Sequence, residues 1–240
     1  MEKDAYKQTY EAEENHWWFK GIRNIIFSIL NKYIKENNLK ILDAGCGTGI
    51  LLTKLKKFGE TTGIDISDNA LEFCKQRGLT DLHKGTIENL PFQENTFDLV
   101  TSIDVIYHKE VQSDLKALQE INRVLKKDGL ALIQVAAYNF MYSNHDKFVH
   151  TQRRYKKQEI KNKLEQAGFK IEKLTYANTI LFPLALIKRL TEHKDSKSEL
   201  KPLSNGINNF LANILTLESK IIENVNLPFG LSIIALARKQ

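Results

Sequence analysis

The sequence is poor in cysteine and has no apolar run long enough to cross a membrane. Its two cysteines, Cys46 and Cys74, are too few for a disulfide framework, so we expect reduced thiols and a cytoplasmic protein. The apolar stretch at 180–187 is much shorter than the roughly 20 residues of a membrane-spanning helix, and Pro183 interrupts it. The N-terminal segment MEKDAYKQTYEAEEN is polar and acidic, which predicts no secretory signal. Repeats and low-complexity tracts are also absent.

The composition is typical of a globular protein. Apolar residues make up 42% and charged residues 27% of the 240 positions, so we expect a single domain with a sizeable core. The net charge of +6 is compatible with an acidic partner such as nucleic acid, phosphate or an anionic lipid surface. Lysine-rich solvated faces are the commoner origin of such a balance, so the charge alone selects no partner.

Segments typical of strands and helices alternate along the chain. Strands are expected at residues 40–44, 61–65, 81–85, 97–103, 130–137, 169–177 and 231–238. Helical patterns fill the gaps at 49–58, 68–77, 111–126 and 156–167. The alternation predicts an α/β fold, with a mainly parallel sheet that helices cover on both faces.

A glycine-rich turn follows the first expected strand, in the sequence ILDAGCGTG at 41–49. Glycine is required where the backbone takes positive φ or where a ligand lies against it. About twenty residues later the second strand ends in Asp65, where a carboxylate would hold a ribose diol in a nucleotide-binding βαβ unit. The third glycine, Gly49, comes one residue too early for a dinucleotide-binding loop, and Ile50 occupies the expected position. The spacing therefore argues against NAD.

Asp43 and the G-x-G-x-G turn, with the acidic end of the second strand, resemble motif I of the class I S-adenosylmethionine-dependent methyltransferases. The resemblance implies a Rossmann-like fold with a seven-stranded sheet and an antiparallel last strand. It also implies S-adenosylmethionine as the cofactor and S-adenosylhomocysteine as the product. The free N–H groups at the start of the helix after the turn would bind the methionine carboxylate. The expected cofactor-binding residues are Asp43, Gly45, Cys46, Gly47, Gly49, Asp65, Ile66, Thr86, Ile87, Ile103, Trp18 and Arg23.

Residues 85–100 are similar to the family's connection between strands three and four. The family often has aspartate at the position of Thr86, where it contacts the adenine amino group. We expect this contact to be weaker, mediated by water or moved to Glu88, whereas the backbone contact of Ile87 does not depend on the side chain.

Relative to this core, the resemblance divides residues 1–240 into four parts. Residues 1–37 are expected to form a helical lid from helices at 3–14 and 16–37, and residues 38–177 the cofactor-binding core. A helical insert at 178–228 contains the apolar stretch 180–187, a polar linker and an amphipathic helix at about 207–224. The last strand lies within 229–240.

Two further stretches, HWWFKGIR at 16–23 and NHDKFVHTQRRYKKQEI at 144–160, are similar to a microbial subgroup of these methyltransferases. The subgroup carries H-W-W-F near its start and H-D-x(4)-H-x-R-R-Y after strand five. Its genes often accompany those for surface glycans and lipid-linked intermediates. Its acceptors are diverse, so this similarity implies a reaction class and no acceptor.

A cluster of polar side chains follows strand five, at the edge where an open α/β sheet binds its ligand. One of its histidines is a candidate general base and one arginine a candidate anion clamp. The alternative is a salt-bridged loop, with Asp146 paired to Arg153 or Arg154 and Tyr155 packed under the next helix. His108, after strand four, is another candidate base or a partner for the helix near Val111. The catalytic candidates are His145, His150 and His108, and the substrate-binding candidates are Trp17, Asp146, Arg153, Arg154 and Tyr155.

Three residues of the N-terminal region have open roles. Trp17 and Trp18 either lie over the sulfonium, where cation–π attraction favours aromatic faces, or anchor the lid helix to the core. Arg23 either reaches the cofactor carboxylate or lies at the surface.

We expect no metal, because no acidic cluster elsewhere matches His145, Asp146 and His150.

The leading interpretation is an enzyme that methylates a small molecule, a glycan or a lipid-linked acceptor by in-line displacement, mainly at oxygen. An RNA or protein methyltransferase is the alternative that the charge allows, although no RNA-binding appendage is recognisable. A non-catalytic module that binds the cofactor would show a broken glycine turn or a lost Asp65, and both are intact. The basic residues Lys188 and Arg189 after the apolar stretch also allow peripheral contact with a membrane.

Overall fold

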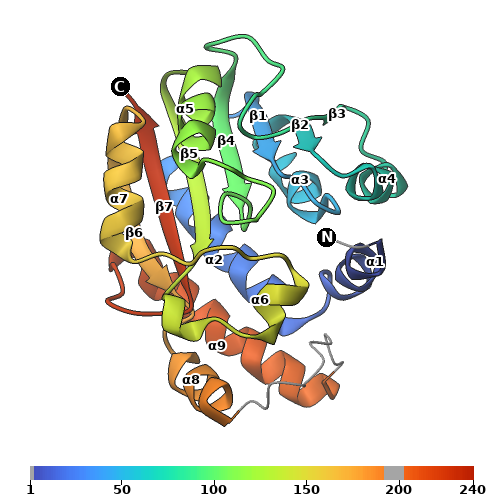
Figure 1. The fold of residues 1–240 in the computed structure, drawn as a ribbon, viewed down its shortest axis with the longest axis vertical. Coiled ribbons are helices and arrows are strands. Elements are labelled where there is room, and N and C mark those ends of the chain that lie inside the picture. The colour runs from blue at the N-terminus through green and yellow to red at the C-terminus, as the bar shows by residue number, and fades with distance from the viewer. Residues whose placement is uncertain (1–2, 192–202) are drawn as a thin grey trace.

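A seven-stranded sheet forms the centre of the computed structural model, which describes residues 3–191 and 203–240 (Figure 1). The strand order is β3-β2-β1-β4-β5-β7-β6, and β7 is antiparallel to both of its neighbours whereas all other pairs are parallel. The α/β class and the antiparallel last strand are thus confirmed. The strands are β1 Leu39–Ala44, β2 Gly59–Asp65, β3 Leu82–Lys84, β4 Phe97–Ile103, β5 Leu125–Ala136, β6 Phe169–Ala177 and β7 Ser232–Lys239.

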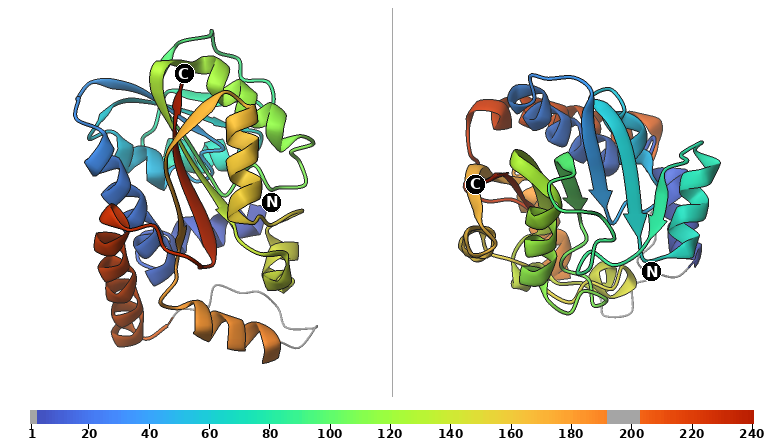
Figure 2. Two further views of the ribbon diagram at one scale, coloured as in Figure 1. Left: turned by 90° about the vertical axis from the view of Figure 1, so that its left-hand side faces the viewer. Right: turned by 90° about the horizontal axis from the view of Figure 1, so that it is seen from above.

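Helices cover both faces of the sheet, so the central strands are apolar on both sides. On β1, Ile41 packs into one core cluster with α2, α3 and α9, while Leu42 packs into the other with α5 and α7. Figure 2 shows α2 and α9 on one side of the sheet and α5 and α7 on the other. The helices are α1 Lys3–Ala12, α2 Trp17–Tyr33, α3 Ile50–Leu55, α4 Asp68–Gln76, α5 Asp114–Val124, α6 Asn144–Phe148, α7 Lys157–Gln166, α8 Phe182–Thr191 and α9 Asn205–Asn224, with a 3-10 turn at Asn139–Met141.

The junction between α5 and β5 differs from the sequence-based expectation. The helix was expected to reach residue 126 and the strand to begin at 130, but β5 begins at Leu125, directly after α5. Leu125 is fully buried and pairs with Phe97 of β4, and the ammonium of Lys126 lies 2.7 Å from the Asp98 carboxylate. This added pairing explains why the chain leaves the helix early.

The two N-terminal helices differ in their environment. α2 buries Ile22, Ile25, Ile26 and Ile29 in the core and ends at Tyr33, four residues before the expected limit of 37. α1 lies beside α4 at the carboxyl edge of the sheet, with the rings of Tyr10 and Phe73 4.9 Å apart (Figure 1). Thus α1 covers the region of the glycine turn, whereas α2 belongs to the core.

α9 packs along α2, because Gly21 allows a close approach. A Cβ at this glycine would lie 2.1 Å from the Leu215 Cδ1 atom. Across the same contact, the Ser28 hydroxyl donates to the backbone carbonyl of Ser219 at 2.9 Å. The expected amphipathic helix is therefore present and packs against α2.

Candidate functional site

The glycine turn leaves backbone exposed at the carboxyl end of β1. Gly45, Gly47 and Gly49 all have positive φ, of 87°, 53° and 85°. A Cβ at Gly45 would lie 2.3 Å from a methyl group of Val105, so the loop after β4 packs directly on the turn. A Cβ at Gly47 would meet no atom within 4 Å. The turn is therefore held on one side and open on the other, where a ligand can lie against the backbone.

Asp65, at the end of β2, is fixed by this turn. Its two carboxylate oxygens accept hydrogen bonds from the N–H groups of Gly47 and Ser67, both at 2.9 Å. The side chain is 8% exposed, and burial raises the pKa of its carboxyl group although these hydrogen bonds oppose the rise. Each oxygen keeps acceptor capacity for a hydroxyl group. The next residue, Ile66, is 53% exposed and offers an apolar surface beside it.

Asp43 is more deeply buried than Asp65. Its carboxylate accepts a hydrogen bond from the Thr101 hydroxyl at 2.7 Å, and burial raises the pKa of its carboxyl group to about 7. Nearby, the sulfur atoms of Cys46 and Cys74 lie 3.8 Å apart as buried free thiols. With a pKa near neutral pH, the carboxyl group of Asp43 is protonated in part of the molecules at pH 7.

The raised pKa of Asp43 predicts a pH dependence of stability. The folded protein holds this proton more tightly than the unfolded chain, so the contribution of Asp43 to stability declines as pH rises from about 4 to about 7. We expect Asp43→Asn to become more stable relative to the wild type over the same range. Urea denaturation at pH 5 and pH 8 measures this difference, with the exposed Asp68→Asn as control. Parallel pH profiles for Asp43→Asn and the wild type would contradict the expectation.

The N-terminal helix α1 lies over the carboxyl end of β2, next to Asp65. Tyr6 is 8% exposed, and its hydroxyl forms a hydrogen bond with Ser67. Burial, followed by the nearby Asp65 carboxylate, raises the pKa of Tyr6 to about 12, and Glu110 contributes to the same effect. Tyr6 thus lies within electrostatic range of both the Asp65 and the Glu110 side chains.

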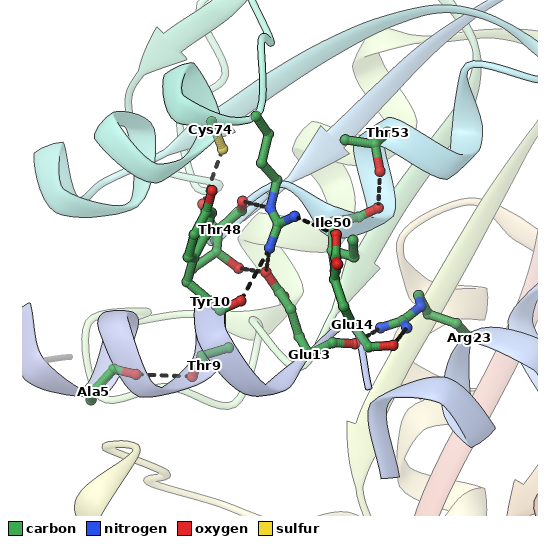
Figure 3. A network of polar contacts seen from close by, with 12 residues as sticks. Ala5, Thr9, Tyr10, Glu13, Glu14, Arg23, Thr48, Ile50, Thr53 and Cys74 are labelled. Atoms are coloured by element: carbon green, nitrogen blue, oxygen red, sulfur yellow. Dashed lines mark hydrogen bonds and ion pairs between the residues drawn. The ribbon is translucent and has the colours of Figure 1, made fainter. Parts of the chain in front are cut away.

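A buried ion pair fastens α1 to the glycine turn (Figure 3). Glu13 accepts a hydrogen bond from the Thr48 hydroxyl and pairs with Arg77 at 2.7 Å. Arg77 also donates from Nε to the Thr48 carbonyl at 2.9 Å and lies over the Tyr10 ring. Glu13 is 3% exposed, and burial raises the pKa of its carboxyl group. No local pattern in the sequence marks this network, because its members are far apart along the chain.

The candidates on α2 are engaged in structural contacts. The Trp18 ring packs against the core cluster that contains Ile22, and the backbone N–H of Trp17 donates to the Asn208 side-chain oxygen at 2.9 Å. Arg23 donates to the backbone carbonyls of Glu13 and Glu14. These contacts correspond to the anchoring alternative for Trp18 and show that Arg23 fixes the junction of α1 and α2.

Further residues expected to bind the cofactor follow β3 and end β4. Ile87 is 5% exposed and Ile103, at the end of β4, is partly exposed. The Glu88 carboxylate accepts from the N–H groups of Gln112 and Ser113 at 3.0 and 2.8 Å. Glu88 is thus engaged at the start of α5, and the Thr86 hydroxyl accepts a hydrogen bond from the Glu88 N–H at 3.3 Å.

Two of the three candidate histidines converge on a carboxylate that the sequence analysis did not select. His150 Nδ1 lies 3.0 Å and His108 Nδ1 lies 3.8 Å from the carboxylate of Glu110. Burial lowers the pKa of His108 to about 4, so this ring is neutral at pH 7. The loops after β4 and β5 also pair directly, through a bridge between His108 and Thr151. His145 begins the H-D motif within α6, and its side chain lies outside the described residues.

The other polar residues after strand five form a salt-bridged loop. Arg154 binds Asp146 through two hydrogen bonds, of 2.8 and 3.0 Å, and donates to the Ala137 carbonyl at 2.8 Å. The Tyr155 hydroxyl donates to Asp114 at 2.7 Å. Arg153 lies 3.4 Å from the same carboxylate. Arg154 and Tyr155 are buried, so these side chains support the loop and do not line an open surface.

Aromatic rings gather beside this loop, at the ends of β5 and β6. Tyr138 stacks on Phe140 and on Tyr176, with centroids 5.1 and 5.2 Å apart, and Phe182 bridges to Phe229 at 5.6 Å. Phe140 is 65% exposed and Phe229 is 41% exposed. The cluster is an apolar surface next to the loop that carries His150.

Neither a metal centre nor a membrane span is evident in the part of the chain that the structure describes. Within residues 3–191 and 203–240, no three His, Cys, Asp or Glu side chains are grouped as metal ligands require. The helices of these two segments are all too short or too polar to cross a membrane.

Comparison with known proteins places the chain among methyltransferases. A family model described as a methyltransferase domain matches residues 42–133. An uncharacterized protein of Methanocaldococcus jannaschii is 34% identical over 200 residues, which cover 78% of this chain and 81% of that protein. A demethylmenaquinone methyltransferase of Staphylococcus aureus is 36% identical over 128 residues, 48% of this chain and 52% of that enzyme, so the chain spans about half its length.

Solved structures share the fold. A S-adenosylmethionine-dependent methyltransferase of Thermotoga maritima superimposes with a TM-score of 0.65, covering 99% of this chain and 95% of that one at 19% identity. At this level of identity the similarity extends to architecture and not to substrate.

Proposed function

The chain belongs to the class I S-adenosylmethionine-dependent methyltransferases, and we propose that residues 1–240 form one methyltransferase domain that methylates a hydroxyl group of an apolar small molecule or lipid-linked acceptor. The enzyme class and the cofactor follow from the family. The acceptor and the methylated atom are the proposed part. The observation that carries the proposal is the convergence of His108 and His150 on Glu110, beside the glycine turn and an exposed aromatic cluster.

The residues around the glycine turn fit the cofactor. The open space beside Gly47 suits a cofactor that lies against the turn, and the remaining acceptor capacity of Asp65 suits a ribose diol. When bound, S-adenosylmethionine supplies a methyl group on a sulfonium, which is a good leaving group. The chain's task is then to orient the acceptor and to exclude water, which can lower a barrier by roughly 7–11 kcal/mol. Tyr6 on α1 and Glu13, directly after α1, lie against this region through Ser67 and Thr48.

His150 is the base that the geometry supports best. A hydroxyl acceptor must lose its proton on methylation, and a histidine held by a carboxylate is suited to take it. The Glu110 carboxylate accepts from Nδ1 of His150, which fixes the tautomer with Nε2 as the basic atom. The neighbouring His108 is too weakly basic at its pKa of about 4 to serve at pH 7, and we assign it a supporting role.

The aromatic cluster supports an apolar acceptor. Exposed rings such as Phe140 and Phe229 cost free energy in water and favour an apolar ligand. The similarity to demethylmenaquinone methyltransferases points in the same direction, since those enzymes act on demethylmenaquinone, a small molecule. The exposed aromatic rings are therefore better explained by a small-molecule or lipid-linked acceptor than by an RNA or protein acceptor.

Transfer of a labelled methyl group tests the proposal. The enzyme is incubated with S-adenosylmethionine carrying a labelled methyl group and with cell extract divided into organic-soluble, aqueous small-molecule, RNA and protein fractions. We expect label in the organic-soluble fraction, and less of it with the Asp65→Ala variant, whose affinity for the cofactor should be reduced. Label confined to RNA or protein would establish the alternative function. Label bound to nitrogen would contradict the hydroxyl assignment.

The helix α8 predicts a weak attachment to anionic membranes. Ile180, Leu184 and Ile187 are 45%, 62% and 60% exposed, whereas Leu181 is buried, so most of the apolar stretch does not pack in the core. Lys188 and Arg189 follow in the sequence, and apolar and basic residues together can hold a protein reversibly at an anionic surface. We expect flotation with anionic vesicles at low salt and none with neutral vesicles. Leu184→Glu should abolish flotation, and an unchanged result for this variant would rule out α8 as the contact.

A further inference from the structure

α9 carries an apolar stripe that is exposed along the length of the helix. The spacing alternates between four and three residues through the series Ile207, Phe210, Ile214, Leu217 and Ile221, and Leu203 continues it just before the helix begins. Ile214 is partly buried, and the other members are exposed. Leu217 is 58% exposed, Ile207 is 54% exposed and Phe210 is 65% exposed. Isolated surface apolar residues are common, but a continuous exposed row of them marks a binding surface.

The stripe lies opposite the side of α9 that packs on α2. At 100° per residue, Ala212, Leu215 and Ser219 fall on the far side of the helix from Phe210 and Leu217. Those three residues are buried, and Leu215 lies against Gly21 of α2. One side of α9 thus belongs to this molecule's core, and the apolar stripe on the other side is left exposed by the residues that the structure describes.

We propose that α9 pairs antiparallel with α9 of a second copy of this chain. Alternating spacings of four and three are the seam of a two-helix packing, in which each apolar residue enters a gap on the facing helix. A two-fold axis that crosses the stripe at the level of Ala212 pairs every residue of the stripe with a residue of the stripe in the other copy. It brings Leu203 to Ile221, Ile207 to Leu217, and Phe210 to Ile214 of the other copy. The contact is therefore self-complementary, as a two-fold dimer requires.

The charges along α9 favour a second copy over a membrane surface. Chains with a net charge of +6 repel each other, so the contact between two copies must itself carry little charge. Along the exposed flank of the stripe stand Asn209, Asn213, Lys220 and Asn224, of which one is charged. A helix that binds an anionic membrane has several lysines or arginines on this flank. The antiparallel register places Lys220 opposite Ser204 of the partner copy and away from its own counterpart.

The composition of the neighbouring segment supports the same choice. Residues 192–202, which join α8 to α9 along the chain, include one aliphatic residue, Leu200. A segment of this composition has no apolar row that matches the stripe. A second α9 has the matching row by symmetry.

Light scattering of the full chain over a range of concentrations tests the pairing. We expect the wild type to have twice the mass of one chain at micromolar concentration. Phe210→Glu and Leu217→Glu should each weaken the dimer at least tenfold, because they bring carboxylates into the seam. Leu184→Glu, which changes an equally exposed residue on α8, should leave the dimer unchanged. Circular dichroism and S-adenosylhomocysteine binding confirm that the variants fold.

Cysteine cross-linking tests the register. Because both native cysteines are buried, an oxidant acts on engineered ones. In the antiparallel pairing, the double variant Ile207→Cys/Leu217→Cys should form a covalent dimer, and neither single variant should. Cross-linking of each single variant would show a parallel pairing and overturn the register.

Two results would overturn the dimer itself. One is a wild-type mass of a single chain at all concentrations up to about 100 μM. The other is a dimer that persists in both Phe210→Glu and Leu217→Glu, which would place the contact elsewhere. If the monomeric wild type instead floats with vesicles of phosphatidylcholine and phosphatidylglycerol, and Phe210→Glu does not, the stripe is a membrane contact.

Discussion

Replacing Asp65 by alanine is expected to weaken the binding of S-adenosylmethionine and S-adenosylhomocysteine by roughly 1–3 kcal/mol, about 5- to 150-fold. The variant removes the acceptor that we assign to the ribose hydroxyls. It also leaves the N–H groups of Gly47 and Ser67 without their present partner, so the glycine turn loses a fixed support. Both losses reduce affinity in the same direction. Titration calorimetry with S-adenosylhomocysteine measures the change, without the need for a known acceptor.

The control for this variant is Asp68→Ala, three residues along the chain. Asp68 has a side chain that is 76% exposed and pairs with Lys84 at the surface, where an ion pair contributes little. We expect its affinity to equal that of the wild type, and NAD to bind neither protein. Unaltered affinity in Asp65→Ala would remove Asp65 from the cofactor site, whatever the family similarity implies.

Features that depend on neighbouring residues were predictable from the sequence. The glycine turn and the acidic end of β2 act through backbone conformation and local hydrogen bonds, so their spacing identified the cofactor class. The central strands β1 and β4 were recognisable because burial on both faces makes them rich in apolar residues. The start of β5 was wrong by five residues, since the pairing of Leu125 with Phe97 depends on a distant strand.

The parts of the site built from distant residues were not predictable in the same way. Glu13 reaches Thr48 across 35 positions and Arg77 across 64, and nothing local marks these three as partners. Glu110 stands in a short polar run, and its role emerges only when the loops after β4 and β5 meet. The sequence left open which arginine pairs with Asp146, and adjacent positions such as 153 and 154 differ only in the direction their side chains take.

The pairing of Arg154 with Asp146 leads to the largest effect on stability that we expect. In Arg154→Ala, the carboxylate of Asp146, which is 1% exposed, loses both charged hydrogen bonds and keeps those from Ser143. An unpaired buried charge of this kind costs about 3–5 kcal/mol. The Ala137 carbonyl loses a donor as well. We expect the variant to unfold at markedly lower urea concentration than the wild type.

The neighbouring Arg153→Ala is the matched control, because its loss leaves Asp114 paired. The ammonium of Lys163 lies 2.8 Å and the hydroxyl of Tyr155 2.7 Å from that carboxylate, so we expect a change of about 1 kcal/mol or less. A double-mutant cycle with Asp146→Ala separates a pair effect from independent ones, since the double variant should lose far less than the sum of the two single losses. If Arg154→Ala instead unfolds like the wild type but no longer transfers methyl groups, Arg154 acts on the acceptor. The salt-bridged loop would then be part of the reaction site, because its arginine would be free to exchange Asp146 for an anionic group of the substrate.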